Sequence, residues 1–163
     1  EGDGVLDPGV VAVDRCGAEQ DIGEGDGLDA QTQKLLDDAE KLTQDNNTIV
    51  LQVAFNYGSR QEILRVAKRI ASLAARGELA PEQLTTDWIS DNLHTKHRPD
   101  PDLLIRTGED LRISNFLLWQ SAYTDFVFVP ENWPDFTEDT FARCLVEFHN
   151  RERRYGGLNV QTA

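Results

Sequence analysis

The sequence predicts an α/β fold with a parallel central sheet flanked by helices. Two short apolar runs, Thr48–Phe55 and Leu103–Ile105, predict buried strands, because a nearly continuous apolar run is typical of a parallel strand covered on both faces. Segments with apolar side chains at helical spacing precede, separate and follow these runs. Strands that alternate with helices in this way form βαβ units.

The composition is that of a globular protein of about one domain: 163 residues, 39% hydrophobic and 28% charged. No apolar run approaches the roughly 20 residues of a membrane span, and the first residues lack the pattern of a signal peptide. Cys16 and Cys144 lie far apart in no metal or redox spacing, which favours free thiols in a reducing compartment. We therefore expect a cytoplasmic protein.

The formal net charge of −13 is concentrated in the first third of the chain, where residues 1–50 carry thirteen acidic and three basic side chains. This balance argues against nucleic acid as a partner, because nucleic-acid binding requires a basic surface. It does not exclude a small anionic substrate, since a local arginine cluster sets the field in a pocket.

Residues 1–27 are predicted to be an acidic, Gly-rich segment distinct from a single domain formed by residues 28–163. Within the segment, Val10–Val13 could form a short strand and residues 17–27 read as a loop. A helix follows over residues 28–42, with a leucine stripe opposite a charged face.

After the strand at Thr48–Phe55, a turn leads into a helix that ends near Arg76, with Ser59 as its expected N-cap. Another helix is predicted over Glu82–Leu93. His94 and His97 follow it without an acidic partner at ligand spacing, so a solvated linker is favoured over a metal site.

The C-terminal part predicts a strand near residues 126–129 and a last helix with Thr137 as N-cap. That helix runs into Arg151–Arg154, which holds three arginines in four residues. Basic residues complement the dipole of a helix C-terminus, but this many also suggest a cluster that faces phosphate.

The most informative stretch is the loop after Leu103–Ile105, where Arg106 and Arg112 stand six residues apart and Ser114 follows the second. Ligands of open α/β sheets bind at the carboxyl ends of the strands, and guanidinium and hydroxyl groups suit phosphate oxygens. The alternative is a surface loop whose arginines pair with Glu109 and Asp110. The spacing alone leaves both interpretations open.

Several motifs in order carry a family resemblance: AFNYGSRQEI, DLLIRTGEDLRISNFLLWQSAY, WPDF and NRERRYGG. Over roughly residues 48–157 the chain resembles the C-terminal half of a cis-prenyltransferase of the undecaprenyl diphosphate synthase type. The resemblance implies a (2Z,6E)-farnesyl or undecaprenyl diphosphate synthase. Such an enzyme condenses isopentenyl diphosphate onto an allylic diphosphate, with Mg²⁺, to make a Z-polyprenyl diphosphate, the cell-wall lipid carrier. It also implies a homodimer peripheral to the membrane.

The resemblance assigns roles to particular residues. Arg106, Arg112 and Ser114 match the residues that bind isopentenyl diphosphate. Arg154 and Gly156 match an element that reaches the phosphates of the partner subunit. Asp125 stands where the family usually has a glutamate implicated in Mg²⁺ and proton handling, and is expected as a catalytic and metal-binding residue.

The family's N-terminal Asp-Gly-Asn-x-Arg loop, which supplies the main Mg²⁺ ligand and holds the allylic diphosphate, does not occur in the sequence. We therefore expect the N-terminal part of a cis-prenyltransferase-like domain to be missing. Two alternatives remain: a non-catalytic accessory subunit of a prenyltransferase dimer, and a stand-alone anion-binding α/β domain.

Overall fold

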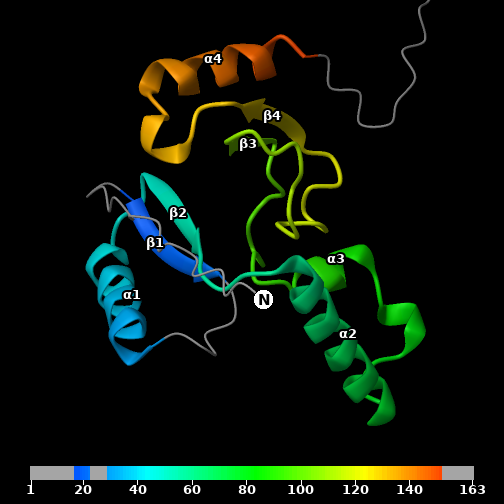
Figure 1. The fold of residues 1–163 in the computed structure, drawn as a ribbon. Helices are drawn as coiled ribbons and strands as arrows, with labels where there is room; N and C mark the ends of the chain where they lie inside the picture. The colour runs from blue at the N-terminus through cyan, green and yellow to red at the C-terminus, as the bar shows by residue number, and fades with distance from the viewer. Residues whose placement is uncertain (1–16, 23–28, 152–163) are drawn as a thin grey trace, which may run out of the picture. The chain divides into compact units, whose positions relative to one another are not determined.

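The computed structural model describes residues 17–22 and 29–151 of the chain. The chain divides into two compact units, Glu1–Tyr57 and Gly58–Ala163. In the first unit the elements run β1, α1, β2; in the second they run α2, α3, β3, β4, α4, with short 3₁₀ turns before α3 and α4 (Figure 1).

The first unit is a βαβ element. Strands β1 (Gly17–Ile22) and β2 (Ile49–Ala54) pair in parallel along their whole length. Helix α1 (Ala30–Thr43) joins them and packs along β1 (Figure 1). Asp29 caps this helix, because its Oδ1 accepts from the backbone N–H groups of Gln31 and Thr32 at 2.9 Å. The hydrogen bond from the Thr32 hydroxyl, together with those from the two backbone N–H groups, lowers the pKa of Asp29.

The helix predicted over residues 28–42 and the strand predicted over residues 48–55 are confirmed. The loop predicted over residues 17–27 is wrong for its first six residues, which form β1. The sequence Gly-Ala-Glu-Gln-Asp-Ile has no clear apolar alternation, so its strand conformation comes from pairing with β2 and not from local propensity. The strand predicted at Val10–Val13 lies outside the described residues.

The second unit begins with α2 (Ser59–Ala75), followed by a 3₁₀ turn (Pro81–Gln83) and α3 (Thr86–Ser90). The continuous helix predicted over residues 82–93 is therefore wrong. Thr85 has an extended backbone, and its side chain accepts from the Trp88 N–H at 3.1 Å, so it starts a new helix. Threonine competes in this way with a continuing helix.

Strands β3 (Leu103–Thr107) and β4 (Asp125–Val129) form a second parallel pair, with Leu103 opposite Asp125 and Thr107 opposite Val129. Helix α4 (Glu138–His149) packs on β4 (Figure 1). Thr137 caps α4 as predicted, because its Oγ1 accepts from the Thr140 N–H at 3.2 Å. The predicted α/β class with parallel strands and flanking helices is confirmed, with the described strands arranged as two pairs.

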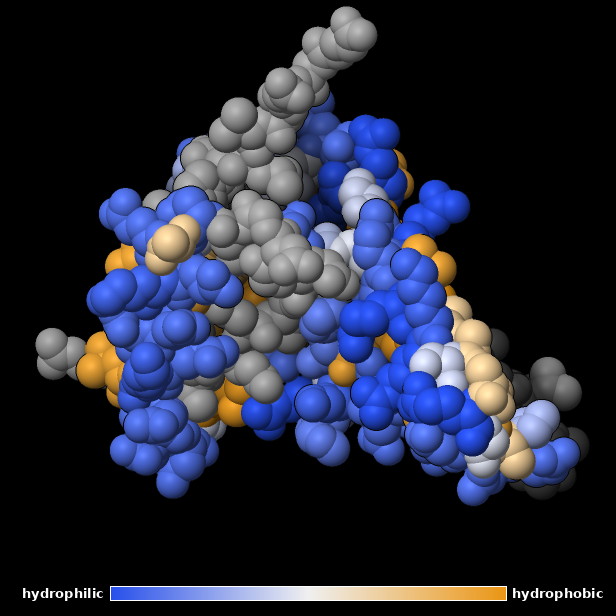
Figure 2. Space-filling view, turned by 90° about the horizontal axis from the view of Figure 1, so that it is seen from below, coloured by the Kyte–Doolittle hydropathy of each residue, from blue (hydrophilic) through white to orange (hydrophobic). Residues whose placement is uncertain are grey.

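Buried side chains in the described residues are few, and polar ones are as prominent as apolar ones. Burial raises the pKa of the Cys144 thiol, which is free as predicted. In the face shown in Figure 2, hydrophobic groups appear as separate patches on a mainly hydrophilic surface. No helix within residues 17–22 and 29–151 has the length and apolar character needed to cross a membrane. The buried apolar residues are Val66, Leu79, Leu93, Val127 and Cys144; the buried polar ones are Thr43, Ser59, Glu62, Gln120, Ser121 and Thr140.

Candidate anion-binding site

Arg106 lies near the carboxyl end of β3, opposite Phe128 of β4. The strand ends at Thr107, and Gly108 turns the chain with φ +87°, a conformation that favours glycine. The Gly108 N–H donates to the Glu131 carbonyl at 2.8 Å, which fixes the start of the following loop. Strand β3 therefore places Arg106 at the edge of the sheet where α/β folds bind ligands.

The Arg106 guanidinium organises this loop. Its Nη1 donates to the Arg112 carbonyl at 2.5 Å and to the Ser114 Oγ at 3.0 Å. A planar guanidinium suits several simultaneous contacts of this kind. The three residues assigned to isopentenyl diphosphate by resemblance, Arg106, Arg112 and Ser114, are thus brought together by direct hydrogen bonds.

The Asp110 carboxylate bridges the two arginines. Its Oδ2 accepts from the Arg106 Nη2 at 3.0 Å, and its Oδ1 pairs with the Arg112 Nη2. The hydrogen bond from Arg112 lowers the pKa of Asp110 most strongly, and Asp110 in turn raises the pKa of Arg112. The ion pairing left open by the sequence is therefore present through Asp110.

This ion pairing does not argue against an anion site, because a carboxylate and a phosphate present similar oxygen pairs to a guanidinium. The Arg112 side chain is 67% exposed, so it is accessible to a ligand from solution. Ser114 is exposed as well. At the end of β3, two cations pair with one carboxylate, and the Ser114 hydroxyl lies beside the first of them.

Asp125 lies elsewhere in the strand pair. It is the first residue of β4, opposite Leu103, and its N–H donates to the Asp102 carbonyl at 3.0 Å. Three strand positions, about 10 Å of backbone, separate it from the residue opposite Arg106. Its carboxylate accepts from the Arg151 Nη1 at 3.4 Å.

The described residues do not make a magnesium site by themselves. No group of three or more His, Cys, Asp or Glu side chains within residues 17–22 and 29–151 is placed to hold a metal ion. Mg²⁺ requires several oxygen ligands, and the Asp125 carboxylate has a guanidinium beside it. The catalytic and metal-binding role of Asp125 stays a prediction, and Arg154 and Gly156 lie outside the described residues.

The sequence reasoning missed the polar residues behind the loop. Ser59 is not the N-cap of α2: Gly58 occupies that position, and the Ser59 hydroxyl instead accepts from the Leu118 N–H at 2.8 Å. Glu62, 1% exposed, was not singled out. Its position four residues before Val66 places it on the buried face of the helix, which is the signal that could have found it.

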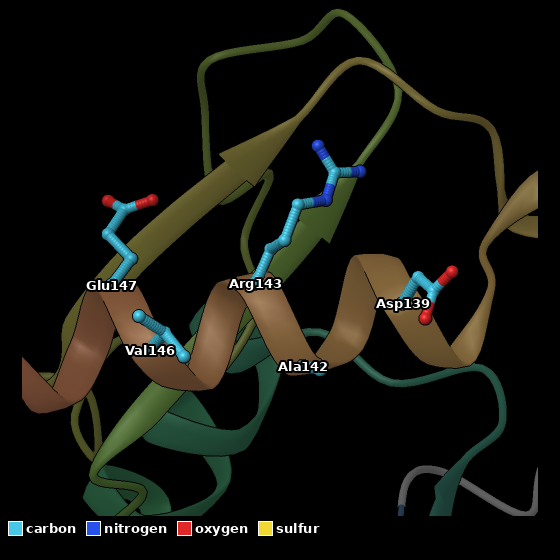
Figure 3. A pocket seen from close by; sticks show the side chains of 5 residues that line it. All are labelled: Asp139, Ala142, Arg143, Val146 and Glu147. Atoms are coloured by element: carbon cyan, nitrogen blue, oxygen red, sulfur yellow. The ribbon is translucent and has the colours of Figure 1, made fainter.

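A hollow of about 590 Å³ lies on α4 (Figure 3). Its described lining residues all belong to α4, and Arg143 and Glu147 project from the same side of the helix (Figure 3). Arg143 donates to Glu131 at 2.7 Å. None of the arginines of the β3 loop lines this hollow, so we place the candidate site at the loop.

The known proteins that this chain resembles belong to one family. The family model described as "Putative undecaprenyl diphosphate synthase" matches residues 18–156. The chain is 48% identical over 142 residues to isoprenyl transferase 2 of Bradyrhizobium diazoefficiens, covering 87% of this chain and 56% of the relative. It is 46% identical to isoprenyl transferase of Agrobacterium fabrum, covering 87% and 58%. The chain thus spans a little over half the length of these relatives.

Solved structures agree. The chain is similar to lavandulyl diphosphate synthase from Lavandula x intermedia in complex with dimethylallyl diphosphate, with a TM-score of 0.83 and 33% identity over 89% of this chain and 62% of that one. It is also similar to a probable undecaprenyl diphosphate synthase from Campylobacter jejuni, with a TM-score of 0.69 and 32% identity over 86% and 63%. The chain belongs to the undecaprenyl diphosphate synthase family of prenyltransferases.

Proposed function

We propose that the loop after β3 binds the diphosphate of isopentenyl diphosphate, and that the chain is the homoallylic half of a cis-prenyltransferase. In this role it takes part in condensing isopentenyl diphosphate onto an allylic diphosphate to give a Z-polyprenyl diphosphate. The observation that carries the proposal is the convergence of Arg106, Arg112 and Ser114, joined by hydrogen bonds and bridged by Asp110.

The chemistry of these groups fits a substrate that must be held without being cleaved. Two guanidinium groups neutralise diphosphate charge and offer paired N–H donors, and the Ser114 hydroxyl adds a neutral donor. None of the three is a general base for water at neutral pH. The loop therefore binds and orients the diphosphate, leaving the hydrocarbon end free to react elsewhere.

The comparisons support an isoprenoid diphosphate as the substrate class. Relatives are named isoprenyl transferases, and one structural neighbour holds dimethylallyl diphosphate, which is an allylic diphosphate. The remaining parts of the proposal come from the family resemblance: Mg²⁺ as cofactor, Asp125 in proton handling, a lipid product at the membrane and a homodimer. In that dimer Arg154 and Gly156 would reach the partner's phosphates.

Incorporation of labelled isopentenyl diphosphate into butanol-extractable product tests this function. The assay contains the 163-residue chain, farnesyl diphosphate and Mg²⁺. Product that disappears with Arg112→Ala would show a working transferase. Binding of isopentenyl diphosphate without product, with activity restored by a full-length relative, would show a half-enzyme or accessory subunit. Absence of both binding and product would overturn the proposal.

Replacing Asp110 with asparagine should strengthen binding of inorganic pyrophosphate. A diphosphate has to displace the Asp110 carboxylate from both arginines, whereas an asparagine side chain is neutral and competes less. The Arg112 pair is exposed and the Arg106 pair partly so, and we therefore expect a gain of only about two- to fivefold in affinity, measured by titration calorimetry. Weaker binding would instead mean that Asp110 is needed to hold the arginines in place.

The control for this variant is Glu78→Gln. Glu78 pairs with Arg76, on an exposed surface beyond the C-terminus of α2. Glu78→Gln removes the same charge from an arginine–carboxylate pair. A similar gain in pyrophosphate affinity with this variant would therefore point to a general effect of net charge.

A further inference from the structure

The segment that carries Ser114 has an unusual backbone. Ser114, Asn115 and Leu117 all have positive φ, at 45°, 65° and 45°. The left-handed region is unfavourable for a residue with a side chain, and asparagine tolerates it better than leucine or serine. Such a conformation persists only where the surroundings hold it. The position of the Ser114 hydroxyl, 3.0 Å from the Arg106 Nη1, therefore depends on what lies behind the loop.

The first turn of α2 supplies that support. The N-cap residue, Gly58, has no side chain to satisfy the free N–H groups of the helix N-terminus. Asn115, far along the chain, satisfies these groups: its carbonyl accepts from the Ser59 N–H and its Oδ1 from the Arg60 N–H, both at 2.8 Å. The loop caps the helix, and the helix fixes the loop.

Ser59 makes the contact reciprocal. It is fully buried, and its Oγ accepts from the Leu118 N–H at 2.8 Å. The segment with positive φ at Ser114, Asn115 and Leu117 is thus held at Asn115 and at Leu118. We call the contacts of Ser59 with Asn115 and Leu118 the α2 latch.

A second buried contact holds the end of the segment. Gln120, 2% exposed, donates from its Nε2 to the Glu62 Oε2 at 3.3 Å and to the Thr95 Oγ1 at 3.0 Å. The other oxygen of Glu62 accepts from the His94 N–H at 2.5 Å. Breaking these bonds would leave desolvated groups unpaired, in addition to the Gln120 Oε1, which is buried without a hydrogen-bond partner among the described residues.

Gly58 lies close to the side chains beside the latch. A Cβ on Gly58 would lie 2.5 Å from the Gln61 Oε1 and 2.8 Å from the Asn115 Nδ2, so the ends of these two side chains would have to move to admit it.

We propose that Ser59 is a positioning residue for diphosphate binding: through the α2 latch it holds the strained loop so that the Ser114 hydroxyl and the arginine pair face the same ligand. This rests on the proposed function for its ligand. The latch touches no reacting atom. Its effect is on the affinity for diphosphate, exerted through the backbone of residues 114–118.

Three variants test the proposal: Ser59→Ala, Ser59→Thr and Cys144→Ala. Ser59→Ala removes the acceptor of the Leu118 N–H, whereas Ser59→Thr keeps the hydroxyl but adds a methyl group to a fully buried site. Cys144→Ala opens a small cavity under α4, in the same unit. All three should lower the unfolding midpoint, so stability alone cannot distinguish them.

Affinity for inorganic pyrophosphate distinguishes them, measured by calorimetry at a temperature where every variant stays folded. We expect about tenfold weaker binding for Ser59→Ala, the loss of one well-placed hydrogen-bond group, and less than twofold change for the other two. Equal affinity in all variants, or losses that follow stability alone, would overturn the proposal.

Hydrogen exchange tests the effect of the α2 latch on the loop independently of ligand binding. Amides of residues 115–118 should exchange faster in Ser59→Ala than in Cys144→Ala without any ligand present. If wild type binds no pyrophosphate, the proposed function fails; the exchange rates then still decide whether the latch holds the loop, and unchanged rates would refute it.

Discussion

Replacing Arg106 with alanine should weaken binding of isopentenyl diphosphate by more than about 100-fold, since charge-assisted hydrogen bonds contribute about 1.5–3 kcal/mol each and a guanidinium makes two to a phosphate. The side chain is 24% exposed and also holds the Arg112 carbonyl and the Ser114 hydroxyl. Loss of the guanidinium therefore removes one of the two cations that would contact the ligand. It also releases the Arg112 carbonyl and the Ser114 hydroxyl. Titration calorimetry with isopentenyl diphosphate measures the effect.

Arg106→Lys divides the effect into charge and geometry. Lysine keeps the positive charge but lacks the planar fork that contacts three groups at once. We expect its affinity to lie between those of wild type and Arg106→Ala. Arg76→Ala is the matched control, because Arg76 is an exposed arginine paired with Glu78. Comparable losses for Arg76→Ala and Arg106→Ala would show that net charge, not the loop, governs binding.

Replacing Leu93 with alanine should destabilise the second unit by about 2–5 kcal/mol, the usual cost of removing a fully buried leucine side chain. Leu93 is 2% exposed and is among the largest fully buried side chains described. Since domains are stable by only about 5–15 kcal/mol, this is a large share. Urea unfolding followed by tryptophan fluorescence measures it, because Trp88, Trp119 and Trp133 all belong to this unit.

Leu64→Ala provides the comparison. Leu64 lies on α2 and is 53% exposed, so the same truncation there should change stability by less than about 0.5 kcal/mol. Similar costs at both positions would contradict the assignment of Leu93 to the core.

Periodicity and apolar runs predicted the elements that pack through their own side chains. The strand at Ile49–Ala54 and the helices α1, α2 and α4 were all expected close to their observed bounds. Strand β1 was missed because its conformation depends on a partner strand and not on its own residues. Thr85 broke a predicted helix because its side chain satisfies a backbone N–H locally.

The site was predictable to a different extent. The motif wording indicated Arg106, Arg112 and Ser114, and the structure brings them together. The support from α2 was not predictable, because Ser59 and Asn115 are 56 positions apart and each has a common local role of its own. A serine at a helix start reads as a cap, and an asparagine in a loop reads as a turn.

The Asp110 bridge has a consequence for how a substrate arrives. The two arginines and the aspartate sum to a single positive charge, within a chain of formal net charge −13. Long-range attraction of a diphosphate is therefore weak, and the net charge of the chain repels it within a Debye length, about 10 Å at 0.1 M salt. Added salt screens this repulsion, so the association rate should rise with ionic strength instead of falling. In the proposed function, a diphosphate gains its contacts with the two arginines where it replaces the Asp110 carboxylate.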